Sequence, residues 1–206
     1  MISRFFIVSI FTIVTTILWA KTPENIKAIE KEITVAGCRF KMIDRYNGTL
    51  TVYEEQNNAN YHAVVNPTAR RTFDTWIQFS CESAADAKTI SLLSGMRMTP
   101  KGWAIDPQSG YPAIKGAHTK FHALHGKGWH GGGVSMDDTD GDETRRVRGY
   151  GFCIIHEQVA LCGTVRHVGY LQHLNESVLP QVIKMLNSIE FVDDPSATPA
   201  RPVSSP

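Results

Sequence analysis

The chain has 206 residues, 42% of them hydrophobic, and carries 21 Lys and Arg against 20 Asp and Glu. This length and composition allow one domain with a sizeable core. The nearly balanced charge argues against a dedicated nucleic-acid-binding protein, because such a protein carries a marked excess of basic residues.

The first twenty residues have the order of a secretory signal peptide. Arg4 precedes an apolar run over 5–19, and the small residue Ala20 ends it. A charged start, an apolar centre and a small residue at the cut are typical of a segment removed on export. The run is too short to span a bilayer comfortably. We therefore expect a signal peptide over 1–20, a periplasmic or secreted protein, and no membrane association after cleavage. An uncleaved anchor is the alternative, because Leu18 is bulky for its position.

The first part of the mature chain reads mostly as strands. A short helix is expected over 22–31, where a capping hydroxyl precedes a proline at the first helical position. The Asn47-Gly48 pair predicts a hairpin turn. Alternating runs predict strands over 33–42, 49–54, 61–65 and 75–81. In the last of these strands Trp76 and Gln78 share one face.

The middle of the chain mixes one helix with glycine-rich and proline-rich segments. A helix is predicted over 84–93, with Ser83 as its cap and Gly95 at its end. The stretch 96–112 is rich in Pro and Gly and is expected to be an irregular loop. The segment 126–133 has too many glycines for an ordinary strand interior, so a bulged strand and a flexible loop both remain open. Short strands are expected over 103–105, 118–125 and 134–136.

The stretch 148–191 is the most readable part of the chain. Two short β-branched runs on either side of Glu157-Gln158 predict an antiparallel hairpin. With these two residues as the loop, Cys153 lies directly opposite Cys162 in a non-hydrogen-bonded pair. The short Cα–Cα separation of such a pair suits a disulfide.

The cysteine count supports a disulfide framework. All four cysteines lie in the expected mature chain, and an even number in an exported chain favours disulfides. Because the hairpin pairs Cys153 with Cys162, the remaining pair is Cys38 with Cys81. Four free thiols are the alternative.

The last elements complete a single expected domain over 21–192. A helix is expected to begin near Ser177, because Pro180 is tolerated only in a first turn, and a short strand follows over 189–192. Eight or nine mostly consecutive strands predict an α+β fold of antiparallel sheets packed with two or three helices. The tail, 193–206, holds four prolines and little that is apolar, so we expect it to be disordered.

The acidic turn after the glycine-rich segment is the first candidate site. An EF-hand alignment centred on Gly141 puts Met136 and Val147 at ligand positions, and neither side chain has the oxygen that calcium needs. A solvated hairpin tip that pairs with the following arginines, and an acidic knob that meets a basic partner, remain as alternatives. The candidate partner-binding residues are Asp137, Asp138, Asp140, Asp142 and Glu143, with the loop aromatic Trp129 as an anchor.

A run of histidines is the second candidate. His122, His125 and His130 fall close together in sequence and offer an alternative metal site with imidazole ligands. The sequence has no HExxH or CxxC motif. Ser135 lacks the second glycine of a nucleophile elbow, and oxidised cysteines cannot act as nucleophiles. We therefore expect no enzyme activity and no cofactor.

Two resemblances suggest a function. From Tyr150 onward, the order of hairpin, helix near LPQVIKML and closing SIEF strand resembles the end of the PsbP-like α/β sandwich. The whole layout resembles periplasmic immunity proteins of type VI secretion systems, which have a cleavable signal, one disulfide-stapled domain and no active-site signature. The second resemblance implies a toxin inhibitor that occludes the active site of a cognate toxin. No functional residue of either family is matched to a position in this chain.

Overall fold

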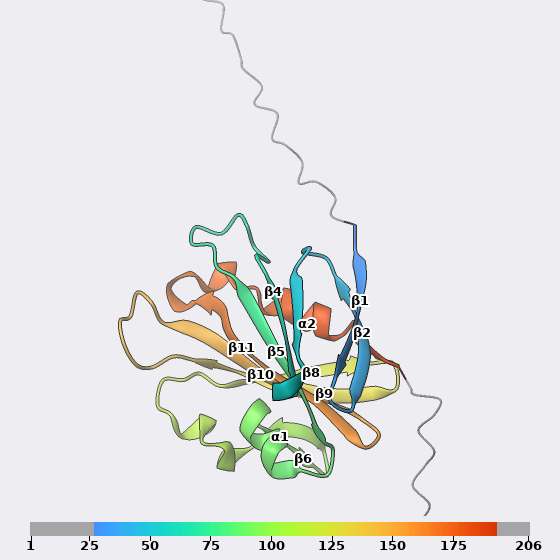
Figure 1. The fold of residues 1–206 in the computed structure, drawn as a ribbon. Helices are drawn as coiled ribbons and strands as arrows, with labels where there is room; N and C mark the ends of the chain where they lie inside the picture. The colour runs from blue at the N-terminus through green and yellow to red at the C-terminus, as the bar shows by residue number, and fades with distance from the viewer. Residues whose placement is uncertain (1–26, 193–206) are drawn as a thin grey trace, which may run out of the picture.

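The computed structural model describes residues 27–192, the side chain of residue 113 excepted. The expected signal peptide and C-terminal tail lie outside these residues. The centre of the fold is a seven-stranded antiparallel sheet in the order β3-β4-β5-β11-β10-β9-β8 (Figure 1). Its strands are β3 (Thr49–Tyr53), β4 (Asn58–Ala63), β5 (Thr75–Ser83), β8 (Lys120–Gly126), β9 (Trp129–Asp137), β10 (Val147–His156) and β11 (Val159–Tyr170).

A second layer covers one face of this sheet. It contains helix α2 and a three-stranded sheet in the order β1-β2-β12. Phe40 of β2 packs on Phe79 of β5 with the ring centroids 5.5 Å apart, and Val182 of α2 is fully buried in the same core. The elements of this layer are β1 (Ile29–Val35), β2 (Cys38–Asp44), α2 (Leu179–Leu186) and β12 (Glu190–Phe191). Antiparallel sheets with few helices confirm the predicted α+β class.

A smaller layer covers part of the opposite face, below the sheet in the view of Figure 1. It contains α1 (Ala87–Ser94) and the hairpin of β6 (Met96–Thr99) and β7 (Gly102–Ile105). The expected loop over 96–112 therefore holds a hairpin, followed by short 3-10 turns. The remaining 3-10 elements of the described chain are η1 (Glu54–Gln56), η2 (Pro107–Ser109), η3 (Tyr111–Ala113) and η4 (Leu171–Glu176).

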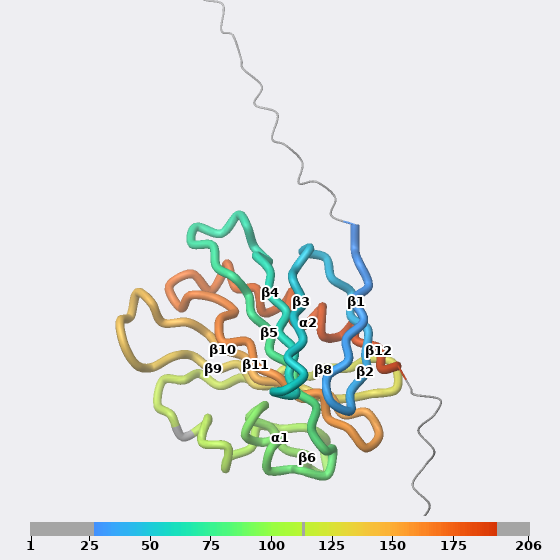
Figure 2. The backbone as a smooth tube through the Cα atoms, viewed as in Figure 1, coloured from blue at the N-terminus to red at the C-terminus, as the bar shows by residue number. Residues whose placement is uncertain are grey.

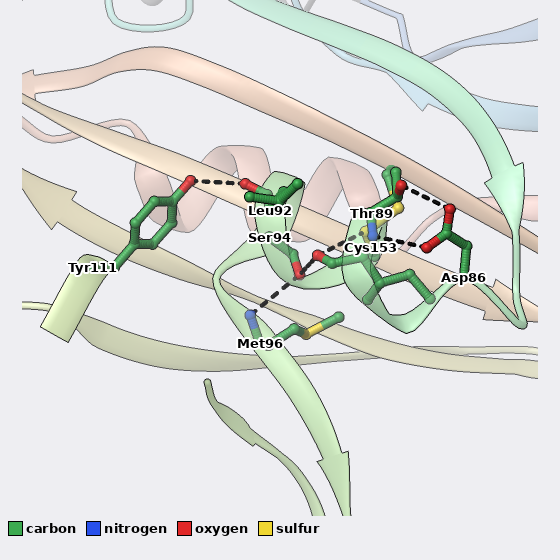
Figure 3. Close-up of a disulfide and its surroundings, with 9 residues drawn as sticks. Asp86, Thr89, Leu92, Ser94, Met96, Tyr111 and Cys153 are labelled. Carbon is green, nitrogen blue, oxygen red and sulfur yellow. Dashed lines mark hydrogen bonds between the residues drawn. A yellow bond between two sulfur atoms is a disulfide. The ribbon is translucent and has the colours of Figure 1, made fainter. Parts of the chain in front are cut away.

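Helix α1 is fixed over the disulfide of the β10–β11 hairpin (Figure 3). Asp86, and not the predicted Ser83, caps the helix, because its carboxylate accepts hydrogen bonds from the backbone and hydroxyl of Thr89 at 3.0 and 2.8 Å. Gly95 ends the helix in the left-handed region with φ 70°, as predicted. The hydroxyl of Tyr111 donates to the carbonyl of Leu92 at 3.2 Å and ties the following loop to the helix.

Both predicted disulfides are present. Cys153 lies directly opposite Cys162 in the β10–β11 register, with the Cα atoms 4.0 Å apart. Cys38 of β2 is bonded to Cys81 of β5, so this second disulfide joins the two sheets. Glu157 takes φ 50° in the two-residue loop of the hairpin. Two disulfides are typical of proteins that fold in an oxidising compartment.

Three predictions about the N-terminal part are wrong. Of the expected helix over 22–31, residues 22–26 lie outside the described residues, and residues 29–31 belong to strand β1. The expected strand over 33–42 is a hairpin of β1 and β2. Its turn is Ala36-Gly37, with Ala36 at φ 48°, a pair whose turn signal is weak. Asn47-Gly48 lies in the connection between β2 and β3, with Asn47 at φ 51°, but the strands on its two sides belong to different sheets, so the predicted hairpin is absent.

The buried carboxylate of Asp44 explains the last of these differences. It accepts hydrogen bonds from the backbone of Tyr46 at 2.8 Å, the backbone of Gly48 at 2.9 Å and the hydroxyl of Tyr61 at 2.7 Å. These bonds fold the connection around one side chain and satisfy the backbone N–H groups of Tyr46 and Gly48. Hydrogen bonds between β2 and β3 are therefore not needed to hold this connection in place.

The glycine-rich segment is neither a flexible loop nor a bulged strand: residues 129–133 begin strand β9, which pairs with β8 and β10 in an unbroken register. Figure 2 shows the course of its backbone beside β8 and β10. The turn is Lys127-Gly128, with Gly128 at φ 75°, and β9 follows. No helix among the described residues is long and apolar enough to cross a membrane.

Candidate functional site

The acidic loop, residues 138–146, joins β9 to β10 and projects from one end of the sheet, on the left in Figure 1. It carries four exposed carboxylates on Asp138, Asp140, Asp142 and Glu143. Because β9 and β10 pair along eight residue positions, the loop is held at the end of a firm ladder. The predicted acidic surface is therefore present with one residue fewer than expected.

Asp137 is the residue that does not belong to the exposed surface. Its side chain is 5% exposed and pairs with the guanidinium of Arg148, whose Nη2 lies 3.0 Å from Oδ2. The Nδ1 atom of His118 is 3.1 Å from the same Oδ2. Asp137 is the last residue of β9, so its carboxylate closes the base of the loop and is not available to a partner.

Part of the loop charge is paired internally, as one of the two alternatives predicted. Arg145 lies 3.9 Å from Asp142, and Arg146 lies 3.5 Å from Glu143. Hydrogen bonds from the backbone and hydroxyl of Thr144 lower the pKa of Asp142. Within the described chain, Asp138 and Asp140 form no ion pair. These two carboxylates remain open to a cationic partner.

Arg71 braces the acidic loop from a neighbouring connection. Its Nη1 donates to the carbonyl of Thr144 at 3.0 Å, and its guanidinium lies 4.0 Å above the ring of Tyr170. Arg146 adds a bond within the loop, from Nη2 to the carbonyl of Gly141 at 3.2 Å. Contacts of this kind reduce the conformational freedom that the loop would lose on binding.

A cavity of about 610 Å³ lies at the base of the acidic loop. Leu171 and Leu174 of η4 provide its apolar part, and Leu174 is 38% exposed. Its polar lining residues include Lys115, His118, Asp138, Arg146 and Arg148. The loop and this cavity form one continuous surface, because Asp138 belongs to both.

Trp129 is not the partner-binding anchor that we predicted. It is 5% exposed and packs in the main core, and its Nε1 donates to the carbonyl of Ile189 at 2.7 Å. The sequence placed it in a glycine-rich loop, whereas it is the first residue of β9. A tryptophan in the core needs a partner for its N–H, and here a loop carbonyl supplies it.

The three histidines of the alternative metal site do not converge. His122 lies 3.0 Å from the hydroxyl of Ser135, and burial, followed by the charges of Lys120 and Arg148, lowers its pKa. His125 and His130 are cross-strand partners, and His130 accepts a hydrogen bond from Trp103 at 2.9 Å.

Strand alternation explains the separation, because it places His122 and His125 on opposite faces of β8. The described chain contains no group of three His, Cys, Asp or Glu side chains that could hold a metal ion.

The structure also shows the state of the candidate nucleophiles, the four cysteines and Ser135. All four cysteines of the chain form disulfides, so a cysteine nucleophile is excluded. Ser135 has a histidine partner, but the residue is 1% exposed and a substrate cannot reach its hydroxyl.

No family model, curated protein or solved structure matches this chain. The order of hairpin, helix and closing strand expected after Tyr150 is the order of β10, β11, α2 and β12. The two family resemblances that rest on this order and on the general layout stay predictions.

Sequence analysis missed a second concave surface, on the face of β4, β5 and β11 that bears Trp76. It encloses about 390 Å³. Trp76 and Gln78 were expected to share a face, and both are exposed there. The other lining residues are Asn60, Asp74, Thr164, Arg166 and His167. The alternation of residues 75–81 could have shown that Trp76 and Gln78 lie at the centre of this surface. The residues around them come from strands distant in sequence, which the sequence pattern does not bring together.

His167, at the edge of this surface, should make stability depend on pH. Its ring stacks on Phe73 at 3.6 Å, and its Nε2 is buried without a hydrogen-bond partner in the described chain. Burial, and secondarily the charge of Arg71, lowers its pKa to about 4. The unfolded chain therefore takes up a proton below about pH 6.5 that the folded chain refuses until about pH 4.

We expect the free energy of unfolding to fall by about 1 kcal/mol between pH 7.5 and pH 5, after a discount for solvent screening of a partly exposed ring. The variant His167→Phe keeps the stacking and should lose this part of the pH dependence. Urea unfolding at the two pH values measures it, with the exposed His125→Gln as the control variant. A pH dependence of His167→Phe equal to that of the unmodified protein would refute the assignment.

Proposed function

We propose that this protein is an exported, periplasmic binding protein that neutralises a secreted bacterial toxin by occupying its active site. The observation that carries the proposal is the acidic loop, in which Asp138 and Asp140 stand unpaired at the end of a firm hairpin. An active site that handles anionic substrates is lined with cations. A rigid acidic loop can therefore compete with the substrate for those cations.

Charge and rigidity make different contributions to this inhibition. The loop bears four carboxylates against two guanidinium groups, a net charge of −2, which steers a basic cleft toward it. The contacts of Arg71 keep the loop from losing much conformational freedom on docking. The cavity beneath the loop, with Leu171 and Leu174, offers apolar area beside the charges. The two disulfides support the proposed compartment.

The test reverses the two unpaired charges. The double variant Asp138→Lys, Asp140→Lys should bind a cognate toxin about 10- to 100-fold more weakly, because attraction becomes repulsion at two positions. The toxin candidate is the product of the neighbouring gene, produced with an export signal in a host that lacks this protein. Calorimetry measures the affinity, and survival of the host measures the protection.

The matched control is Glu54→Lys, Glu55→Lys, which reverses two adjacent exposed carboxylates in η1. It has the same change in net charge and should bind and protect as the unmodified protein does. Raising the salt concentration should weaken toxin binding by the unmodified protein more than toxin binding by the Asp138→Lys, Asp140→Lys variant. Equal affinity and protection by the two double variants would remove the acidic loop from the mechanism.

A further inference from the structure

We propose that the face of the central sheet around Trp76 binds a sugar chain of β-linked N-acetylhexosamine units. This site is separate from the acidic loop and does not depend on the proposed toxin. It is carried by an exposed aromatic ring, a row of unpaired amide and hydroxyl groups, and the concave surface of about 390 Å³ that they line. A concavity of this size fits a small ligand.

The site exists because α1 covers only part of the sheet. Ile90 of α1 packs on Val134 and on the disulfide pair of Cys153 and Cys162, all on β9, β10 and β11. Along β4 and β5 the same face stays open, and Trp76 is 48% exposed there. Its exposed ring lies in a concave part of this face, beside polar side chains.

The polar groups of the site form a straight row across three strands. Asn60 of β4 is the register partner of Gln78 of β5, and Gln78 is the partner of Thr164 of β11. Adjacent strands lie about 4.8 Å apart, so this row extends over about 10 Å. Register pairing fixes all three side chains on one face, which gives an elongated ligand a prepared line of contacts.

These groups have hydrogen-bonding capacity to spare. Within the described chain, the side chains of Asn60, Gln78 and Thr164 form no hydrogen bond. A side-chain amide offers two donors and an acceptor, and a hydroxyl offers both functions. Sugar hydroxyls need this mixture, and an acetamido group presents an N–H and a C=O that two side-chain amides complement.

Trp76 is oriented for stacking. Its ring is parallel to that of its cross-strand partner His62, with the centroids 4.7 Å apart and an angle of 14° between the planes. The stack holds the indole in one orientation, so little rotational freedom is lost on binding. The C–H groups on one face of a pyranose ring pack on such an aromatic surface while the hydroxyls at the ring edge reach the polar row.

The charges around the site disfavour a nucleic acid. One cation, Arg166, and one carboxylate, Asp74, line the concavity, and neither takes part in an ion pair within the described chain. A polyanion needs several cations to displace its counterions, and a lone guanidinium opposed by a carboxylate does not supply them. A neutral ligand with many hydroxyl groups has no such requirement.

The experiment uses chitotetraose, a β-linked tetramer of N-acetylglucosamine, with cellotetraose as the matched sugar without acetamido groups. Calorimetry on the purified full chain should show chitotetraose binding with a Kd of about 0.1–1 mM, as expected for a shallow polar site. The variant Trp76→Ala should weaken it about tenfold, and Gln78→Ala about threefold to tenfold. Cellotetraose should bind at least about tenfold more weakly, for lack of the acetamido contacts.

Two controls keep the result interpretable. Leu92→Ala removes another exposed apolar side chain, 58% exposed on α1, and should bind as the unmodified protein does. The Asp138→Lys, Asp140→Lys variant should also bind the sugar normally, so failure of the toxin proposal and of this one are distinguishable. No heat of binding at millimolar chitotetraose, undiminished binding by Trp76→Ala, or equal binding of cellotetraose would each overturn the proposal.

Discussion

Replacing both Cys38 and Cys81 with serine should lower the free energy of unfolding by about 4 kcal/mol, the larger of the two disulfide effects. The two residues are 43 positions apart, whereas Cys153 and Cys162 are 9 apart. A disulfide that closes a longer loop removes more conformational entropy from the unfolded chain. The same replacement of Cys153 and Cys162 should cost about 2.5 kcal/mol.

The position of the longer disulfide adds to its importance. Within the described chain, the two sheets share no backbone ladder, and Cys38–Cys81 is the covalent tie between β2 and β5. Its loss leaves side-chain packing, such as Phe40 on Phe79, and hydrogen bonds, such as the one from Tyr61 to Asp44, to hold the layers together. Urea unfolding of the two double variants at one pH measures both effects. An equal loss in both variants, or a larger loss from the hairpin pair, would show that loop entropy is not the dominant contribution.

Adding a methyl group at Gly131 or Gly133 should destabilise the fold by about 3 kcal/mol or more. A β carbon on Gly131 would overlap the carbonyl oxygen of Cys153, and one on Gly133 would overlap the carbonyl oxygen of Gly151. Both oxygens belong to the backbone of β10, so relief requires the β9–β10 ladder to shift. Glycine is needed at these positions because the two backbones approach closely there.

Gly149→Ala is the matched control, because it adds the same methyl group in the same pair of strands. The nearest atoms to its β carbon would be backbone oxygens at 3.7 Å, an ordinary contact distance. We expect a change within about 1 kcal/mol for this variant. Thermal and urea unfolding of the three variants provide the comparison. Stability of Gly131→Ala equal to that of Gly149→Ala would mean that the strand adapts and that close approach does not explain the glycine run.

These predictions bear on function because the acidic loop depends on the same ladder. The loop begins where β9 ends and returns into β10, so a shifted β9–β10 register would move Asp138 and Asp140 together. A variant at Gly133 that still folds should therefore also bind the proposed toxin less well. The proposed sugar site on β4, β5 and β11 lies farther from β9 in the strand order, so sugar binding should be affected less by a variant at Gly133.

About half of the candidate site could be predicted from sequence. The acidic turn, with its exposed Asp138, Asp140, Asp142 and Glu143, needed only local composition and turn chemistry. The side chains that were assigned wrongly, Asp137 and Trp129, have their roles set by distant partners. Arg148 removes the first from the surface, and the carbonyl of Ile189 holds the second in the core.

By itself, the sequence determined the features that depend on near neighbours: the α+β class, the strand alternation that exposes Trp76, and the hairpin register that pairs Cys153 with Cys162. These follow from period-2 alternation and short turns, which act within about ten residues. Tertiary structure alone decided which strands distant in sequence became neighbours, such as β5 and β11, and so which side chains meet across β4, β5 and β11. The order of such strands is set by the packing of whole layers, and no local pattern encodes it.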